Sequence, residues 1–111
     1  MDIVREERDG AAVVKLAGRF DSSVAASAET ELNAALGAGA PHIAIDMTGL
    51  DYISSAGLRV LLVMARKVQQ AAGKVALFGL NPNVREVFTV SGFDTIFSIQ
   101  PDAAAALAQV R

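Results

Sequence analysis

Cysteine is absent from this chain of 111 residues. Its absence excludes disulfides, zinc–thiolate sites, iron–sulfur clusters and thiol nucleophiles. No stretch approaches the roughly 20 unbroken apolar residues of a membrane-spanning helix, and the charged residues near the start do not form a signal-peptide pattern. Basic residues form no cluster longer than Arg66-Lys67. We therefore expect a cytoplasmic protein that binds neither nucleic acid nor a membrane, and whose partner is another protein.

Hydrophobic residues make up 52% of the chain, well above the range of disordered sequences. A chain of this length fits one domain, which buries roughly two-thirds of the surface that its unfolded form exposes. The ten basic and twelve acidic residues nearly balance, so the net charge is only -2. We expect one globular domain spanning residues 1–111.

Segments typical of strands alternate along the chain with segments of helical periodicity. Strands are expected at residues 3–4, 12–17, 42–47, 75–78 and 95–99. Helices are expected at residues 24–36, with Asp21, Ser22 or Ser23 as its cap, at 55–72, between Asn81 and Ser91, and at 103–110 after a cap at Asp102. This order predicts an α/β fold, with a mixed sheet of about five strands and about four helices, mainly on one face.

The most specific local feature is the start of the longest helical pattern, which opens with Ser54 and Ser55. A serine hydroxyl at a helix start can cap the free backbone N–H groups, and the same groups can hold a phosphate. On the residues alone, both serines could be caps and nothing more. Ala56 and Gly57 leave a serine here accessible to another protein, and Gly57 costs helix stability that a purely structural sequence could avoid.

Three segments, in order, resemble STAS domains of the bacterial anti-sigma factor antagonist type, also called anti-anti-sigma factors. The segment Tyr52-Ile53-Ser54-Ser55-Ala56-Gly57-Leu58 is similar to the family signature of an aromatic residue, an aliphatic residue, often Asp, then Ser, a small residue, Gly and Leu. Residues 16–21 resemble the family's strand-to-helix turn, and residues 81–88 with Ser91-Gly92 resemble its third helix. The resemblance covers almost the whole chain and implies a STAS-like fold.

The resemblance also implies a phosphorylation site. Ser55 falls on the serine that is phosphorylated in the family, and Asp21 and Asp46 fall on positions that lie close to it. Ser54 stands where some members carry Asp, so Ser54 is an alternative phosphorylation site. The spacing to Gly57 and Leu58 favours Ser55.

The helix that follows suggests a docking face. At about 100° per residue, Leu58, Leu61, Ala65, Val68 and Ala72 form its inward stripe. Val63 falls among the polar residues of the outer side, and Val60 lies near their edge. A single exposed valine is ordinary on a protein surface. The alternative is that Arg59, Val60, Val63 and Arg66 form part of a docking face beside Ser55.

By resemblance, the unphosphorylated chain would bind a serine protein kinase that doubles as an anti-sigma factor, and phosphorylation at Ser55 would release it. A PP2C-type phosphatase would reset the switch. The kinase would use ATP and Mg²⁺, so this chain needs no cofactor of its own. Within the same fold, the alternatives are a partner-switching antagonist with another output, such as secretion or a cyclase, and a module that responds to a nucleotide or other ligand.

An enzyme is the alternative from a different class, for example a hydrolase with Ser55 as nucleophile. The one histidine, His42, is expected at the far end of its strand, about 16 Å from the loop that leads to Ser55. Asp46 and Asp51 could form a carboxylate pair, but nothing else in the sequence supplies a substrate pocket. We therefore expect neither catalysis nor a metal site.

Overall fold

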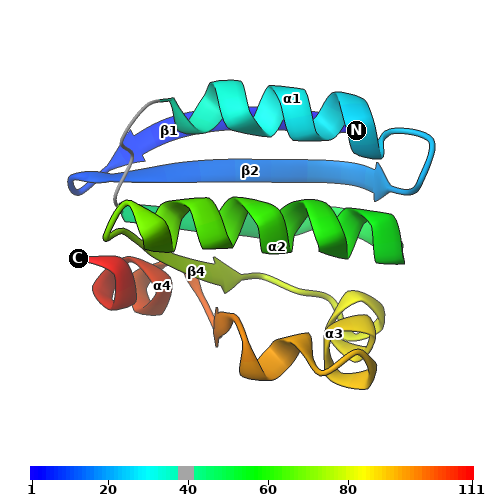
Figure 1. Ribbon diagram of the computed structural model, residues 1–111. Coiled ribbons are helices and arrows are strands. Elements are labelled where there is room, and N and C mark those ends of the chain that lie inside the picture. The colour runs from blue at the N-terminus through cyan, green and yellow to red at the C-terminus, as the bar shows by residue number, and fades with distance from the viewer. Residues whose placement is uncertain (38–41) are drawn as a thin grey trace.

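One mixed sheet organises the molecule, with its strands in the order β1-β2-β3-β4-β5 (Figure 1). The computed structural model describes residues 1–37 and 42–111. The strands are β1 (Asp2–Arg8), β2 (Ala11–Phe20), β3 (His42–Ile53), β4 (Lys74–Phe78) and β5 (Ser98–Gln100). The first two strands form an antiparallel hairpin, and every later pair is parallel. The predicted α/β fold with an initial hairpin is confirmed.

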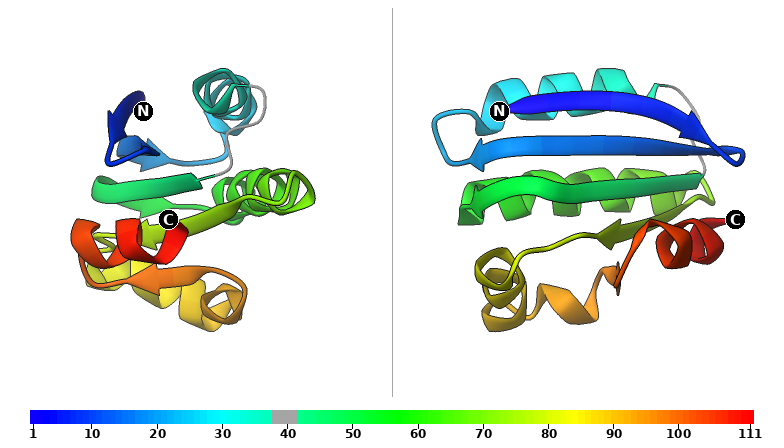
Figure 2. Two further views of the ribbon diagram at one scale, coloured as in Figure 1. Left: turned by 90° about the vertical axis from the view of Figure 1, so that its left-hand side faces the viewer. Right: turned by 180° about the vertical axis from the view of Figure 1, so that it is seen from behind.

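Four α-helices cover the two faces of the sheet unequally (Figure 2). They are α1 (Ala25–Leu36), α2 (Ser55–Gln70), α3 (Pro82–Val90) and α4 (Ala103–Val110), and a short 3-10 turn, η1 (Phe93–Thr95), precedes β5. The larger hydrophobic core joins the sheet to α1, α2 and α3, whereas α4 packs on the opposite face. The expectation of helices mainly on one face is therefore confirmed. Within residues 1–37 and 42–111, no helix is long and apolar enough to cross a membrane.

Alternation along the strands decides which core each side chain joins. On β2, Val14 and Leu16 point into the larger core, and Val13, which precedes Val14, points toward α4. The face under α4 carries small residues, which let the alanine-rich helix approach closely. These small residues are Ala11, Ala44 and Ala76 from the strands and Ala106 from α4.

Strand β3 is longer than its sequence suggests. The sequence predicts a strand at residues 42–47, but pairing with β2 continues to the Phe20–Ile53 pair through two register shifts. These irregularities are β-bulges, which absorb extra residues without ending the ladder. Asp46 and Asp51 therefore both lie within this strand. Other strand bounds also differ, because β1 spans seven residues and the last strand lies at 98–100, after η1.

The ends of α1 and α2 also differ from expectation. Val24 precedes α1 without a side-chain cap, because Asp21 accepts hydrogen bonds from the backbone and hydroxyl of Ser23 instead. At the other end, Arg5 of β1 donates to the carbonyl oxygens of Ala35 and Leu36, at 2.6 and 3.1 Å. Helix α2 ends at Gln70, so Ala72 is an exposed residue beyond the helix and not part of the inward stripe. Gly39, expected to help end α1, lies outside the described residues.

Candidate functional site

Ser54 joins β3 to α2 and is the N-cap of the helix. Its hydroxyl oxygen accepts a hydrogen bond from the backbone N–H of Gly57 at 3.1 Å. The same hydroxyl donates to the carbonyl oxygen of Phe20 at 3.1 Å, and the backbone N–H of Ser54 donates to that carbonyl at 2.9 Å. Ser54 therefore ties the start of α2 to the end of β2, and its half-buried hydroxyl is already engaged.

Ser55 is the first residue of α2, and its side chain is exposed. Its hydroxyl makes no hydrogen bond to any residue in the described part of the chain, whereas the hydroxyl of Ser54 makes two. The adjacent serines thus differ in availability. One holds the backbone together, and the other presents a free hydroxyl beside the positive end of the helix dipole.

Gly57 lets α2 approach the sheet. A Cβ atom at this position would lie 2.9 Å from ring atoms of Phe20 and from Cγ1 of Ile53. Both neighbours are buried, with 0% and 2% exposure, so neither can move freely into solvent. Gly57 therefore has a packing role, and the interpretation that it costs stability without structural reason is wrong.

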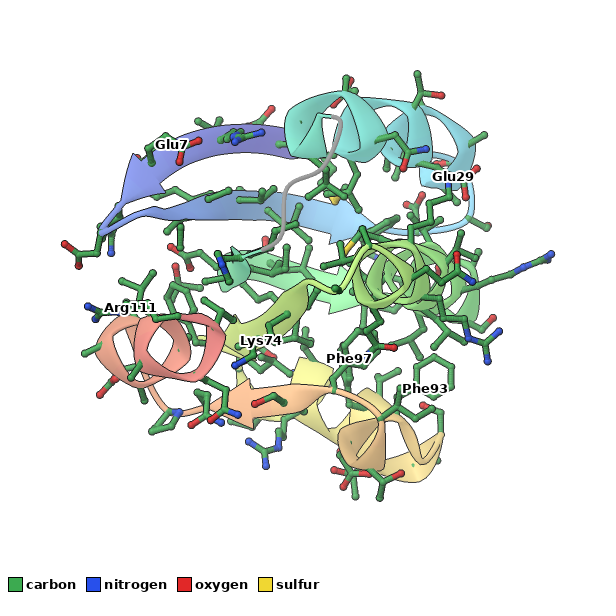
Figure 3. The ribbon with its side chains drawn as sticks, turned by 60° about the vertical axis from the view of Figure 1, so that its left-hand side comes forward. Glu7, Glu29, Lys74, Phe93, Phe97 and Arg111 are labelled. Carbon is green, nitrogen blue, oxygen red and sulfur yellow. The ribbon has the colours of Figure 1, made fainter. Side chains whose placement is uncertain are left out.

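Ser55 lies on the shared rim of two grooves. The first, between α2 and α3, has a volume of about 410 Å³ and is lined by Ser55, Leu58, Asn83, Glu86, Val87, Val90 and Ser91. The second, between α1 and α2, has a volume of about 610 Å³ and is lined by Ala25, Ala26, Glu29, Ser55, Ala56, Arg59, Val60 and Val63. Glu29 projects from α1 on its α2 side (Figure 3). Ser55 is therefore flanked by α1 across one groove and by α3 across the other.

Three of the four predicted docking residues line the groove between α1 and α2, and Arg66 does not. Arg59 is exposed and lines the second groove with the half-buried Val63. Val60 lines the same groove, but it is only 7% exposed and belongs to the larger core, so it offers little surface to a partner. Its helical position near the edge of the polar arc faces α1, which covers it. Arg66 is exposed but lines neither groove.

Several groove residues could not be predicted from the sequence, because they belong to the helices that flank α2. Val90 of α3 is 80% exposed, the most exposed of the large hydrophobic side chains in the described part of the chain. Val87 and Asn83 line the same groove one and two turns earlier in α3. The sequence signal for Val90 was its position as an apolar residue on the outer side of a short amphipathic helix. Its closeness to Ser55 depends on tertiary packing and could not be read from spacing.

Two acidic residues predicted to lie near the serine have different positions. Asp21 follows Phe20, whose carbonyl holds Ser54, so Asp21 does lie beside the site. The hydrogen bond that the Ser23 hydroxyl donates to Asp21 is the main cause that lowers the pKa of this carboxyl below its ordinary value. This carboxylate therefore stays negatively charged well into the acidic range.

Asp46 lies away from Ser55, and the prediction that places it nearby is wrong. It pairs with Lys15 of β2, five residues before Phe20, or about 17 Å along the strand. Its carboxylate accepts hydrogen bonds from the backbone and hydroxyl of Thr48, at 2.9 and 2.7 Å. Asp46 therefore shapes the irregular part of β3.

The one histidine of the chain lies away from the serines. His42 begins β3 in register with Lys74, at the end of the strand opposite Ser55. No group of three or more histidine, aspartate or glutamate residues within residues 1–37 and 42–111 could hold a metal ion. The exposed Ser55 lies between two grooves, whose walls carry the carboxylates of Glu29 and Glu86 and the guanidinium group of Arg59.

A sequence model of the STAS domain matches residues 2–106. The chain belongs to the STAS domain family. This STAS domain is 41% identical over 108 residues to BtrV of Bordetella bronchiseptica, a protein named as an anti-sigma factor antagonist, with 97% of this chain and 93% of BtrV covered. It is 25% identical to the anti-sigma F factor antagonist of Paenibacillus polymyxa, over 99% of this chain and 95% of that protein.

Solved structures agree with the fold. An anti-sigma factor antagonist from Mycobacterium paratuberculosis superposes with a TM-score of 0.89 at 26% identity, over 99% of this STAS domain and 93% of that chain. SpoIIAA in its unphosphorylated form superposes with a TM-score of 0.73 at 23% identity, over 91% of this chain and 90% of that one, and supports the fold alone. The family of this chain is therefore that of the anti-sigma factor antagonists.

Proposed function

We propose that this STAS domain is an anti-sigma factor antagonist controlled by phosphorylation of Ser55. The unphosphorylated form binds a serine protein kinase that acts as an anti-sigma factor, and phosphorylation releases this partner. The observation that carries the proposal is the difference between the two serines. Ser55 is exposed and free between two grooves, whereas Ser54 is held by Phe20 and Gly57.

The geometry supports a binding role in preference to catalysis. The backbone N–H groups and dipole at the start of α2 can accommodate a phosphate. The kinase supplies ATP and Mg²⁺, a PP2C-type phosphatase resets the switch, and this chain acts as a substrate and a binding module without a cofactor. It works in the cytoplasm as one domain and contacts protein partners, with no role for nucleic acid or a membrane.

A Ser55→Ala variant is expected to remain bound to the kinase in the presence of Mg·ATP, while the wild-type protein is released. Because the Ser55 hydroxyl makes no hydrogen bond to the described residues, its loss changes the free energy of unfolding by less than about 0.5 kcal/mol. Retention is measured by pull-down of the purified kinase before and after nucleotide addition, and stability is measured by denaturant unfolding.

The matched control is Ser54→Ala. This variant loses the helix cap and the bond to Phe20, so its free energy of unfolding is expected to fall by about 1–2 kcal/mol. It should still release the kinase after ATP is added, because Ser55 is intact. Release of Ser55→Ala together with retention of Ser54→Ala would transfer the switch to Ser54 and reject the proposal.

A further inference from the structure

The exposed surface of α2 carries only positive charge. Arg59, Arg66 and Lys67 are exposed, and α2 contains no aspartate or glutamate. The ion pairs in the described part of the chain use three other cations, Arg5, Arg8 and Lys15. Within the described residues, Arg59, Arg66 and Lys67 therefore have no carboxylate at ion-pair distance.

Arg59 has a special relation to Ser55 because it follows four positions later in the same helix. Side chains at this spacing lie on one face, with Cβ atoms about 5–6 Å apart. Both residues also line the groove between α1 and α2, so their side chains open onto the same space. An anion placed four residues before a cation is the more favourable order for such a pair, because it also suits the helix dipole.

We propose that Arg59 binds the phosphate of phosphorylated Ser55 within the same chain. This inference rests on the proposed function and adds a second element to the switch. A phosphate brings about -1.5 to -2 charges and three acceptor oxygens, which a guanidinium group can engage through two parallel hydrogen bonds. Phosphorylation then adds negative charge at Ser55 and also withdraws the positive charge of Arg59 from the surface that faces the partner.

Glu29 is the competing anion in this groove. It lines the α1 wall opposite Arg59, but no ion pair joins the two side chains. The phosphate has a higher charge than a carboxylate and sits on the same helix as Arg59. The phosphate therefore interacts more strongly with Arg59 than Glu29 does. Because the phosphate and Glu29 are both negatively charged, they repel each other, and Glu29 is expected to turn away from the phosphate.

The test measures the second pKa of the phosphate group in protein that carries phosphoserine at position 55, installed during synthesis by amber-codon suppression. The phosphorus NMR signal is followed through a pH titration for the otherwise wild-type protein and for Arg59→Gln. Arg59 stabilises the dianion and so lowers this pKa, which means that its removal raises the pKa by roughly 0.2–0.4 unit. Circular dichroism checks that each variant is folded.

Arg66→Gln is the matched control, because it removes the same charge from the same helix two turns further from Ser55. It is expected to leave the phosphate pKa within the titration error. An unchanged pKa in Arg59→Gln, or an equal rise in both variants, would overturn the pairing. Since no kinase is used, this outcome is independent of whether a kinase modifies Ser55, and failure of the proposed function would appear only in the kinase experiments.

Discussion

Phosphorylation of Ser55 is expected to weaken binding of the partner kinase by about a hundredfold or more while the domain stays folded. In the free domain, the start of α2 stabilises the phosphate by about 0.3–1 kcal/mol, and by up to about 2 kcal/mol in a partly buried geometry. The free energy of unfolding of the phosphorylated domain is therefore slightly higher than that of the unmodified domain, or unchanged. Ser55 is exposed, so the phosphate displaces no packed side chain.

In the complex, the same phosphate must lose water against a surface that had accommodated a neutral hydroxyl. Asp21 beside the site and Glu86 in the α2–α3 groove add like-charge repulsion. A hundredfold loss of affinity corresponds to only about 2.7 kcal/mol, which is modest for one unpaired charge in an interface. Binding is thus affected far more than folding.

Isothermal titration calorimetry of the two forms with purified kinase measures the affinity change, and amide NMR spectra report on the fold. Chemical-shift changes are expected near the start of α2 and in the walls of both grooves. Equal affinities for the two forms, or shifts spread over the whole sheet, would contradict a local electrostatic mechanism.

Gly57→Ala is expected to destabilise the domain, although alanine is the better helix former. Propensity alone favours the variant by about 1 kcal/mol. The added methyl group, however, would meet the Phe20 ring and Ile53 at 2.9 Å, and both are buried. Overpacking of this kind costs about 1–3 kcal/mol, so we expect a net loss of up to about 2 kcal/mol and a shift of the first turn of α2.

Urea unfolding decides this point by the sign of the change. A lower free energy of unfolding supports the close contact of α2 with β2 and β3. A free energy of unfolding that rises by about 1 kcal/mol is expected if helix propensity acts alone and the methyl group meets no clash. The first turn of α2 follows directly from Ser54 and begins with Ser55, so its displacement should also slow phosphorylation of the variant. A Gly57→Ala variant that is more stable than the wild type would show that the helix can move away from Phe20 at little cost.

The order of elements could be predicted because it depends on local patterns. Buried strands such as β4 are short apolar runs bounded by turn residues. Helices α3 and α4 follow the caps Asn81 and Asp102, whose side chains accept hydrogen bonds from the backbone N–H groups of Val84 and Ala105. The full length of β3 could not be predicted, since it is sustained by bulged pairing with β2. The placement of Asp46 near the serines came from the family resemblance, and the strand register places it about 17 Å before the end of β2.

The roles of the two serines depend on a contact that sequence spacing does not contain. Both are suitable caps, and only the carbonyl of Phe20, 34 residues earlier in the chain, fixes Ser54 in the structural position. Val60 illustrates the same limit, because its exposure depends on whether α1 lies over it. Local periodicity placed these residues on a helix, and tertiary packing determined which of them a partner can reach.

The central claim is that Ser55 is the residue phosphorylated by the partner kinase. Its most direct test is tandem mass spectrometry of the protein after incubation with that kinase and Mg·ATP, with Ser54→Ala and Ser55→Ala treated in parallel. We expect one phosphate on Ser55 in the wild type and in Ser54→Ala, and no phosphate on Ser55→Ala. A phosphate on Ser54, or undiminished labelling of Ser55→Ala, would contradict it.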